Sequence, residues 1–487
     1  RHAGPRDQTR RSGALDTDDI ARALLYRVAV TDLLAARAQM ALSLAFHIVF
    51  AVVGMAMPLL MLVAESRWLR DRNPIDLELA KRWTKGTAIM FAVGAVSGTV
   101  LSFELGLLWP EFMRLAGPII GMPFSLEGFA FFLEAIFLGI YLYGWERVPP
   151  RAHLFAGFMV LLSGTASGVF VVCANGWMNT PVGFDLDAAG KVIAIDPVAA
   201  MLNPAALPEA LHMTIAAFEA VGFAVAGIHA FALLKDPGNQ LHTRALAIAL
   251  LVGGAAALVQ PLSGHQSAVH VATHQPVKLA AMEAHWDTSK GVGAVLGGWP
   301  DEEAETTSYK LEVPYLMSLL AFNDPDAEIR GLKEWPRDER PPVAVVHVAF
   351  QLMVGAGTAL AALTLLVLLL WWRKKAVPTE PRLLKLIVLA SPLGMIAVQA
   401  GWTVTEVGRQ PWVIRGILRT ADAVTPMPHL AVPFTAFMLL YVILGVVAAA
   451  LLKRHVFATI TPDSPGWPGN GGAHSGGRHN DGRDDDA

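Results

Sequence analysis

The stretch that decides the fold is Ser125–Trp145, SLEGFAFFLEAIFLGIYLYGW. It is long and apolar enough to span a membrane as a helix, yet it carries Glu127 and Glu134. A carboxylate inside a bilayer is costly unless it has a partner or a function. A helix would place these two residues on one face, with Glu134 about 10 Å deeper than Glu127. We interpret the pair as a polar track; a glutamate that caps a neighbouring helix is the alternative.

The composition of the whole chain is that of an integral membrane protein. Of its 487 residues, 54% are hydrophobic and only 16% are charged, and the mean hydropathy is +0.45. The net charge of −3, without a basic cluster, argues against nucleic-acid binding. The single cysteine, Cys173, excludes an intramolecular disulfide and any cysteine-based metal site. We expect Cys173 to pack between helices.

Nine segments are long and apolar enough to cross a bilayer as helices. The predicted spans are 39–64, 86–108, 124–145, 152–173, 208–234, 244–263, 343–372, 383–405 and 430–452. The loops on one side of these spans carry 15 Lys and Arg residues, and the short loops on the other side carry 5. Basic loops stay in the cytoplasm, so we expect the N-terminus outside and the C-terminus inside the cell.

The predicted fold is all-α: a polytopic membrane domain over residues 35–455 with flanking tails. Residues 1–34 are predicted to be a polar extension, since they lack the apolar core of a signal peptide. Residues 456–487 are rich in Gly, Asp and His, and we expect disorder there, with weak metal binding as the alternative. Residues 264–342 are too polar to enter the membrane and form one large outer loop; such loops are often functional.

Other unusual side chains fall in the outer half of the predicted spans. They are His47 in the first span, His212 at the start of the fifth, Met353 in the seventh, and Glu406 and Arg409 at the end of the eighth. Each has a simpler interpretation: a hydrogen-bonded packing histidine, a core-filling methionine, an interfacial arginine. Together, His, Met and carboxylate side chains on different helices at one depth fit the axial ligation of haem iron.

Several strings resemble subunit I of the cytochrome bd-type quinol oxidases. They are ALSLAFHIVF (41–50), LEGFAFFLEAIF (126–137) followed by YGWER (143–147), ANGWMNTP (174–181), QPVKLAAMEAHW (275–286) and EVGRQPW (406–412). The resemblance covers roughly residues 35–455, and that family also has nine spans. It implies that the outer loop is a compact quinol-binding loop.

The resemblance implies three haems and their ligands. His212 and Met353 match the axial ligands of a low-spin haem b, the entry point for electrons from quinol. His47 matches the axial ligand of a high-spin haem, and Glu406 matches the carboxylate ligand of the second high-spin haem. Arg409 lies in the same motif, near the haem propionates. One high-spin haem is of the b type, and the third haem is of the d or the b type.

The resemblance also implies catalytic roles. Glu127 matches the glutamate beside the oxygen-reactive haem, and Glu134 matches the next carboxylate on the proton route. Lys278 and Glu283, in the outer loop, match a pair associated with quinol binding and oxidation. Where better-known members carry an arginine two residues before the axial methionine, this chain has Gln351. Loss of that fixed positive charge is expected to alter the potential of the low-spin haem.

The implied function is that of an electrogenic terminal oxidase of the respiratory chain in a bacterial cytoplasmic (inner) membrane. It would oxidise ubiquinol or menaquinol on the outer side and reduce O2 to water with cytoplasmic protons. The implied partner is a membrane subunit II in a heterodimer, to which a small accessory subunit can be added. The string SFELG (102–106) and the compact outer loop resemble the cyanide-insensitive branch, whose members need not contain haem d.

Two other functions fit part of the pattern. A proton-coupled transporter would use the same glutamates and histidines, but the sequence shows neither an internal repeat nor signs of helices broken at the midplane. A haem protein that only transfers electrons would need His212 and Met353. It would not need His47, Glu127 and Glu406 together.

Overall fold

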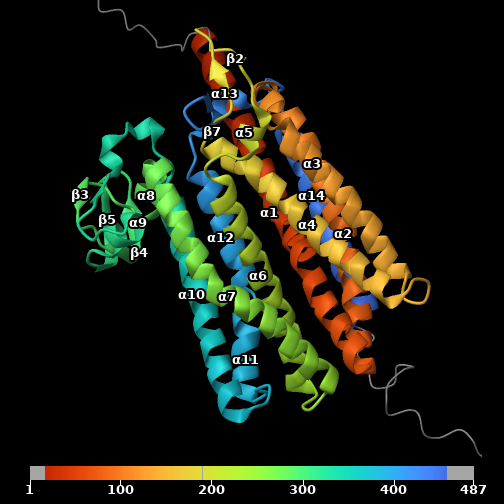
Figure 1. The fold of residues 1–487 in the computed structure, drawn as a ribbon. Helices are drawn as coiled ribbons and strands as arrows, with labels where there is room; N and C mark the ends of the chain where they lie inside the picture. The colour runs from red at the N-terminus through yellow and green to blue at the C-terminus, as the bar shows by residue number, and fades with distance from the viewer. Residues whose placement is uncertain (1–16, 189, 458–487) are drawn as a thin grey trace, which may run out of the picture.

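The computed structural model of the chain describes residues 17–188 and 190–457, with side chains described from residue 32 onward. It shows an elongated bundle of long helices with a small mixed subdomain beside one end (Figure 1). Within the described residues, nine helical segments are long and apolar enough to cross a membrane. The prediction of an all-α polytopic membrane protein with nine spans is therefore confirmed.

The nine spans are formed by ten helices, because the eighth span consists of two. Their bounds are α1 (Thr17–Asp71), α2 (Pro74–Leu108), α3 (Pro110–Tyr143), α4 (Pro150–Asn179), α6 (Ala206–Lys235), α7 (Gln240–His274), α10 (Val343–Lys374), α11 (Pro381–Ala390), α12 (Leu393–Val407) and α14 (Ala431–Leu452). Several of them begin with proline, whose missing N–H group is not needed in the first turn of a helix. Asn73 and Asn239 cap α2 and α7 by accepting hydrogen bonds from backbone N–H groups of the first turn.

Several helices run beyond the predicted spans. The prediction of an outer loop over residues 109–123 is wrong. Helix α3 begins at Pro110, and only Trp109 separates α3 from α2. Helix α7 likewise continues through residues 264–274, which were assigned to the outer loop. Apolar length predicts where a helix crosses the bilayer, but the helix itself ends only where backbone hydrogen bonding stops.

The chain ends are covered only in part. Helix α1 begins at Thr17, so residues 17–34 of the predicted extension are helical. Residues 1–16 of the extension, and residues 458–487 of the expected disordered tail, lie outside the described residues. After α14, a π-helix covers Lys453–Phe457.

The eighth span is interrupted at Ser391 and Pro392, between α11 and α12. The expectation that no helix is broken near the midplane is therefore wrong. Proline removes one backbone donor, and the Ser391 hydroxyl donates 2.8 Å back to the carbonyl of Val388. The close approach of α6 explains a small residue here, since a Cβ on Gly227 would lie 2.2 Å from the Cβ of Ser391.

The main apolar core lies between α1, α6, α7, α10 and α11. Helices α6 and α7 pack through glycines, because a Cβ on Gly222 would lie 2.4 Å from the Cα of Gly253. Small residues at such crossings are typical of membrane helices. Near the predicted cytoplasmic ends, the fully buried Asp76 pairs with Arg244 at 2.8 Å and with Arg67 at 3.7 Å. This ion cluster ties α1, α2 and α7 together.

Short elements lie mainly outside the bundle. They are β1 (Asp185–Leu186), β2 (Val192–Ile193), α5 (Pro197–Met201), α8 (Pro276–Met282), β3 (Ser289–Lys290), β4 (Ala294–Asp301), β5 (Thr306–Val313), α9 (Leu316–Phe322), β6 (Glu328–Ile329), the 3-10 turns Leu332–Glu334 and Arg337–Glu339, β7 (Trp412–Ile414), β8 (Leu418–Arg419) and α13 (Thr420–Ala423). The elements from α8 to the second 3-10 turn form the subdomain, and its centre is the antiparallel β4–β5 hairpin, in which Leu296 faces Leu311. The prediction of a compact loop between the sixth and seventh spans is confirmed.

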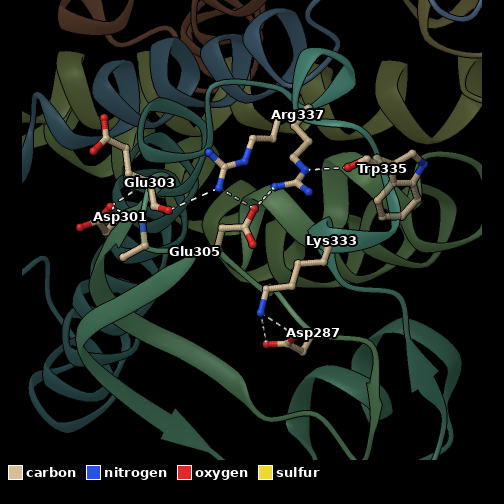
Figure 2. Close-up of polar contacts among 9 residues, drawn as sticks. Asp287, Asp301, Glu303, Glu305, Lys333, Trp335 and Arg337 are labelled. Atoms are coloured by element: carbon tan, nitrogen blue, oxygen red, sulfur yellow. Dashed lines mark hydrogen bonds and ion pairs between the residues drawn. The ribbon is translucent and has the colours of Figure 1, made fainter.

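Ion pairs fix this hairpin to the segment that leads into α10. Glu305, beside the hairpin turn, lies 2.7 Å from Arg340 and 3.2 Å from Arg337, and Lys333 lies 2.7 Å from Asp287 (Figure 2). The hydrogen bond from Arg340 is the main reason why the pKa of Glu305 lies below its usual value. The subdomain is therefore tied to the start of α10 at its outer rim.

Candidate functional site

A cavity of about 750 Å³ lies among α1, α2, α3, α4 and the outer part of α12. This volume is in the range of sites for cofactors and small ligands. Five of the ten predicted site residues line it: His47, Glu127, Glu134, Glu406 and Arg409. The structure therefore brings together side chains that are up to 362 positions apart in the sequence.

The ring of His47 is held at one nitrogen by a contact with α2. Its Nδ1 atom lies 2.9 Å from the Ser97 hydroxyl of α2, and that hydroxyl donates to the carbonyl of Gly94 at 3.1 Å. When the serine proton is on the carbonyl, Nδ1 must donate to the serine, and Nε2 then has a lone pair that can bind a metal. Gly98 leaves room for the ring, since a Cβ there would lie 3.0 Å from Cε1 of His47.

Glu127 and Glu134 of α3 both reach the cavity, as side chains on one helix face should. Glu127 accepts a hydrogen bond of 3.3 Å from the Ser167 hydroxyl of α4. The Glu134 side chain fits between glycines, because Cβ atoms on Gly54 and Gly164 would lie 3.4 and 3.2 Å from its Oε1 atom. The two carboxylates therefore occupy successive depths along one wall of the cavity.

Ser163, one turn before Ser167 on α4, instead donates its hydroxyl at 2.5 Å to the carbonyl of Met159 in its own helix. Of the serines on α4, Ser167 is the one bound to a track carboxylate.

Glu406 and Arg409 form an ion pair at the outer end of the cavity. The Nη2 atom of Arg409 lies 2.6 Å from Oε2 of Glu406, and Asn175 of α4 donates to Oε1. Arg409 is buried, and its Nε and Nη1 atoms have no hydrogen-bond partner within the described part of the chain. Unpaired guanidinium nitrogens in a buried place are costly, so they mark where an anionic group fits.

These features fit a haem. The cavity offers a histidine nitrogen for iron, a carboxylate, and two unpaired guanidinium nitrogens of Arg409 for a propionate. Across the described residues, no cluster of three or more His, Cys, Asp or Glu side chains forms a site for a bare metal ion. Axial haem ligation needs only one or two protein ligands for each iron.

His212 and Met353 lie outside this cavity, on α6 and α10. The Nδ1 atom of His212 lies 3.0 Å from the Ser263 hydroxyl, which donates to the carbonyl of Gln260 at 2.9 Å. His47 has the same arrangement, in which the ring contacts a serine whose hydroxyl also donates to a backbone carbonyl. The Gln260 amide nitrogen lies 3.2 Å from Nε2 of His212, so that side chain would have to move to admit iron. Met353 packs against Gly401 of α12, the helix that also contacts α6.

Lys278 and Glu283 lie at the two ends of α8 and bind different partners. Lys278 donates 2.6 Å to the Asn179 side chain at the end of α4. Burial lowers the pKa of Lys278 to about 7, partly opposed by Glu209. Glu283 accepts 3.0 Å from the backbone N–H of Val295, and burial raises its pKa to about 7.

Gln351 has a role that sequence reasoning missed. Its side chain donates 2.7 Å to the carbonyl of Val295 and accepts 3.1 Å from the N–H of Gly297, so it pairs with the backbone of β4. The expectation for this residue concerned only its missing charge.

Four supporting residues were also missed: Ser97, Ser263, Asn175 and Asn179. The two asparagines stand four residues apart in the string ANGWMNTP, a spacing that puts them on one helix face. This spacing could have identified the two asparagines as a polar pair from the sequence alone. Each serine is one hydroxyl among many on an apolar helix, and only the fold shows which of them meets a histidine.

Over the described residues, the fold and the cavity define a class: a nine-span membrane protein with a cavity between its helices that suits a haem. The family model for cytochrome bd terminal oxidase subunit I matches residues 35–459. The chain belongs to this family. Family membership confirms the resemblance, implies haem cofactors and a subunit II partner, and places the protein among the quinol oxidases of bacterial respiration.

Relatives agree over nearly the whole chain. The chain is similar to "The structure of bd oxidase from Geobacillus thermodenitrificans", with a TM-score of 0.83 and 37% identity over 88% of this chain and 99% of that one. It is 36% identical to "Putative cytochrome bd menaquinol oxidase subunit I" of Bacillus subtilis strain 168, covering 86% of this chain and 96% of that protein. It is 33% identical to the "Cytochrome bd ubiquinol oxidase subunit 1" of the same strain, covering 88% and 94%.

Proposed function

We propose that the chain is the haem-carrying subunit of an electrogenic quinol:oxygen oxidoreductase. Quinol is oxidised at the outer loop, and O2 is reduced to water at the cavity with protons from the cytoplasm. The observation that carries the proposal is the cavity itself. It combines a histidine with a free Nε2 atom, two stacked carboxylates and a buried arginine with unpaired donors.

The ligand assignments are those that the family resemblance implies. His47 and Glu406 would hold the two high-spin haems, with Arg409 binding a propionate. His212 and Met353 would hold the low-spin haem b. When bound, these haems carry electrons from quinol and bind O2; the third haem is of the d or the b type.

The protein's own contribution at the cavity is to deliver protons. Glu134 lies deeper in the membrane than Glu127, and Glu127 is oriented by the Ser167 hydroxyl. A proton held on Glu134 can pass outward to Glu127 and then to the reduced oxygen. Most of the residues around the cavity are apolar, which makes the two carboxylates the candidates for carrying protons through it.

At the outer loop, Lys278 and Glu283 would bind and deprotonate quinol. Both have a pKa near 7, so each can exchange a proton at physiological pH. With the N-terminus outside and the C-terminus in the cytoplasm, the quinol protons leave to the outside. Oxygen reduction takes up protons from the inside, and this separation of charge generates a proton-motive force.

The substrate is ubiquinol or menaquinol, since the names of the two Bacillus relatives mention one each. The membrane is the bacterial cytoplasmic (inner) membrane. We propose that the working complex is a heterodimer with subunit II, to which a small accessory subunit can be added.

The test is Glu134→Gln in the purified complex, assayed by quinol-driven oxygen consumption. We expect slow turnover with an unchanged low-spin haem spectrum, because electron entry does not use this carboxylate. Glu111→Gln is the matched control, since Glu111 lies on the same helix but pairs with Arg114. Normal turnover in Glu134→Gln would exclude the proton track.

A further inference from the structure

Asn175 and Asn179 lie one turn apart near the C-terminal end of α4, and both side chains are buried. They are bonded to each other: the Nδ2 atom of Asn179 lies 3.1 Å from the carbonyl oxygen of Asn175 and 3.3 Å from its Oδ1 atom. A side-chain amide has both donors and an acceptor, so each residue can bond a charged group and still bond its neighbour. We call Asn175 and Asn179 the asparagine bridge.

One end of the asparagine bridge holds Lys278 of the outer loop. The Lys278 ammonium donates 2.6 Å to Oδ1 of Asn179. Its aliphatic stem passes over Gly408, because a Cβ there would lie 2.9 Å from Cγ of Lys278. Gly408 stands between Glu406 and Arg409 in the sequence. The lysine therefore crosses the segment that carries the cavity's ion pair before it reaches α4.

The other end of the asparagine bridge holds Glu406. Asn175 donates to Oε1 of this carboxylate, and Arg409 lies 2.6 Å from Oε2. Hydrogen bonds to an ionised group are stronger than those between neutral groups. The two oxygens are held from different helical segments, so the position of the carboxylate depends on both contacts.

We propose that the asparagine bridge couples the outer loop to the cavity: it positions Lys278 at one end and Glu406 at the other, and a displacement at either end is transmitted to the other. Asn175 and Asn179 are positioning residues, because they act through Lys278 and Glu406. The bridge stands on the hydrogen bonds alone. Its consequences for quinol and for a haem rest on the proposed roles of Lys278 and Glu406.

Electrostatics connect the same two ends. Burial lowers the pKa of Lys278, and the charges of Arg409 and Arg415 lower it further, whereas the charges of Glu209 and Glu406 raise it. Lys278 therefore lies close enough to the ion pair of the cavity to be affected by its charges. A change at Glu406 alters the energy of the ammonium that Asn179 holds.

The end of α4 gives the asparagine bridge a rigid support. Trp177 is fully buried, and its Nε1 atom donates 2.9 Å to the carbonyl of Val182. The backbone N–H of Arg415 donates 3.0 Å to the carbonyl of Met178, which ties the segment after α12 to the same turn. Close-packed surroundings transmit a displacement instead of absorbing it.

A functional consequence follows for the two sites. Quinol that accepts a hydrogen bond from Lys278 competes with Asn179 for the ammonium. The asparagine bridge then shifts, and Glu406 shifts with it. The occupancy of the quinol site is thereby felt at the cavity before any electron has moved.

The first test changes one end and measures the other, by hydrogen exchange of the purified complex with mass spectrometry. Asn175→Leu removes the bond to Glu406, and we expect the amides of residues 276–283 to exchange about tenfold faster, although Asn175 does not bond Lys278. Lys278→Met keeps the stem over Gly408, and we expect the amides of residues 404–412 to exchange about tenfold faster.

Thr180→Val is the matched control. Thr180 follows Asn179, is buried, and donates its hydroxyl 3.0 Å back to the carbonyl of Gly176 in its own helix. It should exchange like the wild type in both segments. If Asn175→Leu does not assemble, Asn179→Asp replaces it, because a carboxylate accepts from Lys278 but cannot donate to Asn175. That variant should keep residues 276–283 protected and speed the exchange of residues 404–412.

The second test follows haem and quinol in the same complex. For Asn179→Leu we expect a KM for quinol raised about tenfold and a shifted high-spin haem spectrum, with the low-spin spectrum unchanged. Thr180→Val should do neither. Combining Asn179→Leu with Lys278→Met should change the high-spin spectrum no more than Asn179→Leu alone, because both break the same chain of bonds.

Exchange that rises only at the substituted end would overturn the coupling, as would additive changes in the double variant. Wild-type exchange at both ends in Asn175→Leu would overturn the bridge itself. A wild type that consumes no oxygen with quinol would contradict the proposed function instead, because the exchange experiment needs no substrate.

Discussion

Replacement of Ser97 by alanine tests the environment of the candidate haem ligand with little change in volume. In Ser97→Ala, His47 loses the acceptor that lies 2.9 Å from its Nδ1 atom, and the ring is free to turn or to change tautomer. Loss of such a supporting hydrogen bond typically lowers metal affinity by about 10- to 100-fold. This corresponds to about 1.4–2.7 kcal/mol.

Thr99→Ala is the matched control. Thr99 lies two residues further along α2, and its hydroxyl also donates to a carbonyl of its own helix, that of Ala95 at 2.9 Å. It lines the same cavity as His47, but its hydroxyl is bonded to its own helix and not to the histidine. Both variants therefore lose one hydroxyl and one bond back to the helix, but only Ser97→Ala loses the contact with the histidine.

The assay is haem retention by the purified complex in the presence of an excess of an apoprotein that captures haem. High-spin haem is followed by its carbon monoxide difference spectrum. We expect Ser97→Ala to lose this haem at about 10- to 100-fold lower scavenger concentration than the wild type, and Thr99→Ala to behave like the wild type. Equal retention in all three proteins would refute the assignment of His47 as a ligand that Ser97 orients.

Three further predictions concern other parts of the site. Met353→Leu should perturb the low-spin haem spectrum, and an unchanged spectrum would show that another residue is the ligand. Gly98→Ala places a Cβ 3.0 Å from the His47 ring and should cost about 1–3 kcal/mol and shift the high-spin haem spectrum, whereas Gly106→Ala on the same helix meets no atom within 4 Å and should do neither. Burial lowers the pKa of Lys278 from 10.5 to about 7. As the pH falls from 9 to 7, the unfolded chain therefore takes up a proton that the folded chain does not. The midpoint temperature of unfolding should fall over this pH range. Lys278→Met should reduce this fall, and an equal fall in both proteins would contradict the buried, neutral lysine.

The spans and the cavity residues could be predicted from the sequence for a simple physical reason. A bilayer requires long apolar helices and makes an ionisable side chain within them unusual, so Glu134 and His47 stand out in a single sequence. Depth along a helix follows from counting residues. Those two facts, with the motif resemblance, single out five side chains, and the structure puts all five in one cavity.

The supporting contacts could not be predicted, because they depend on how helices face one another. Nothing local distinguishes Ser97, which binds His47, from Thr99, which does not. The outer ends of the helices were missed for a related reason: Pro110 could begin a helix or interrupt a loop, and apolar length does not decide between them.

Contacts in the outer loop were even harder to predict from the sequence. Lys278 and Glu283 are close in sequence, but their partners come from α4 and β4. His347 contacts two backbone carbonyls that are 65 and 50 positions away in the sequence. Hydrogen bonds over such separations are properties of the fold.

The most direct test of the whole account is the reduced-minus-oxidised absorbance spectrum of the purified complex, recorded with and without carbon monoxide for the wild type and for His47→Ala. The account predicts haem b bands in both proteins and a carbon monoxide-sensitive high-spin signal that His47→Ala loses or reduces. A far-red band in the wild type would identify the third haem as the d type. A wild type without any haem, or a carbon monoxide signal unaffected by the loss of His47, would contradict the account.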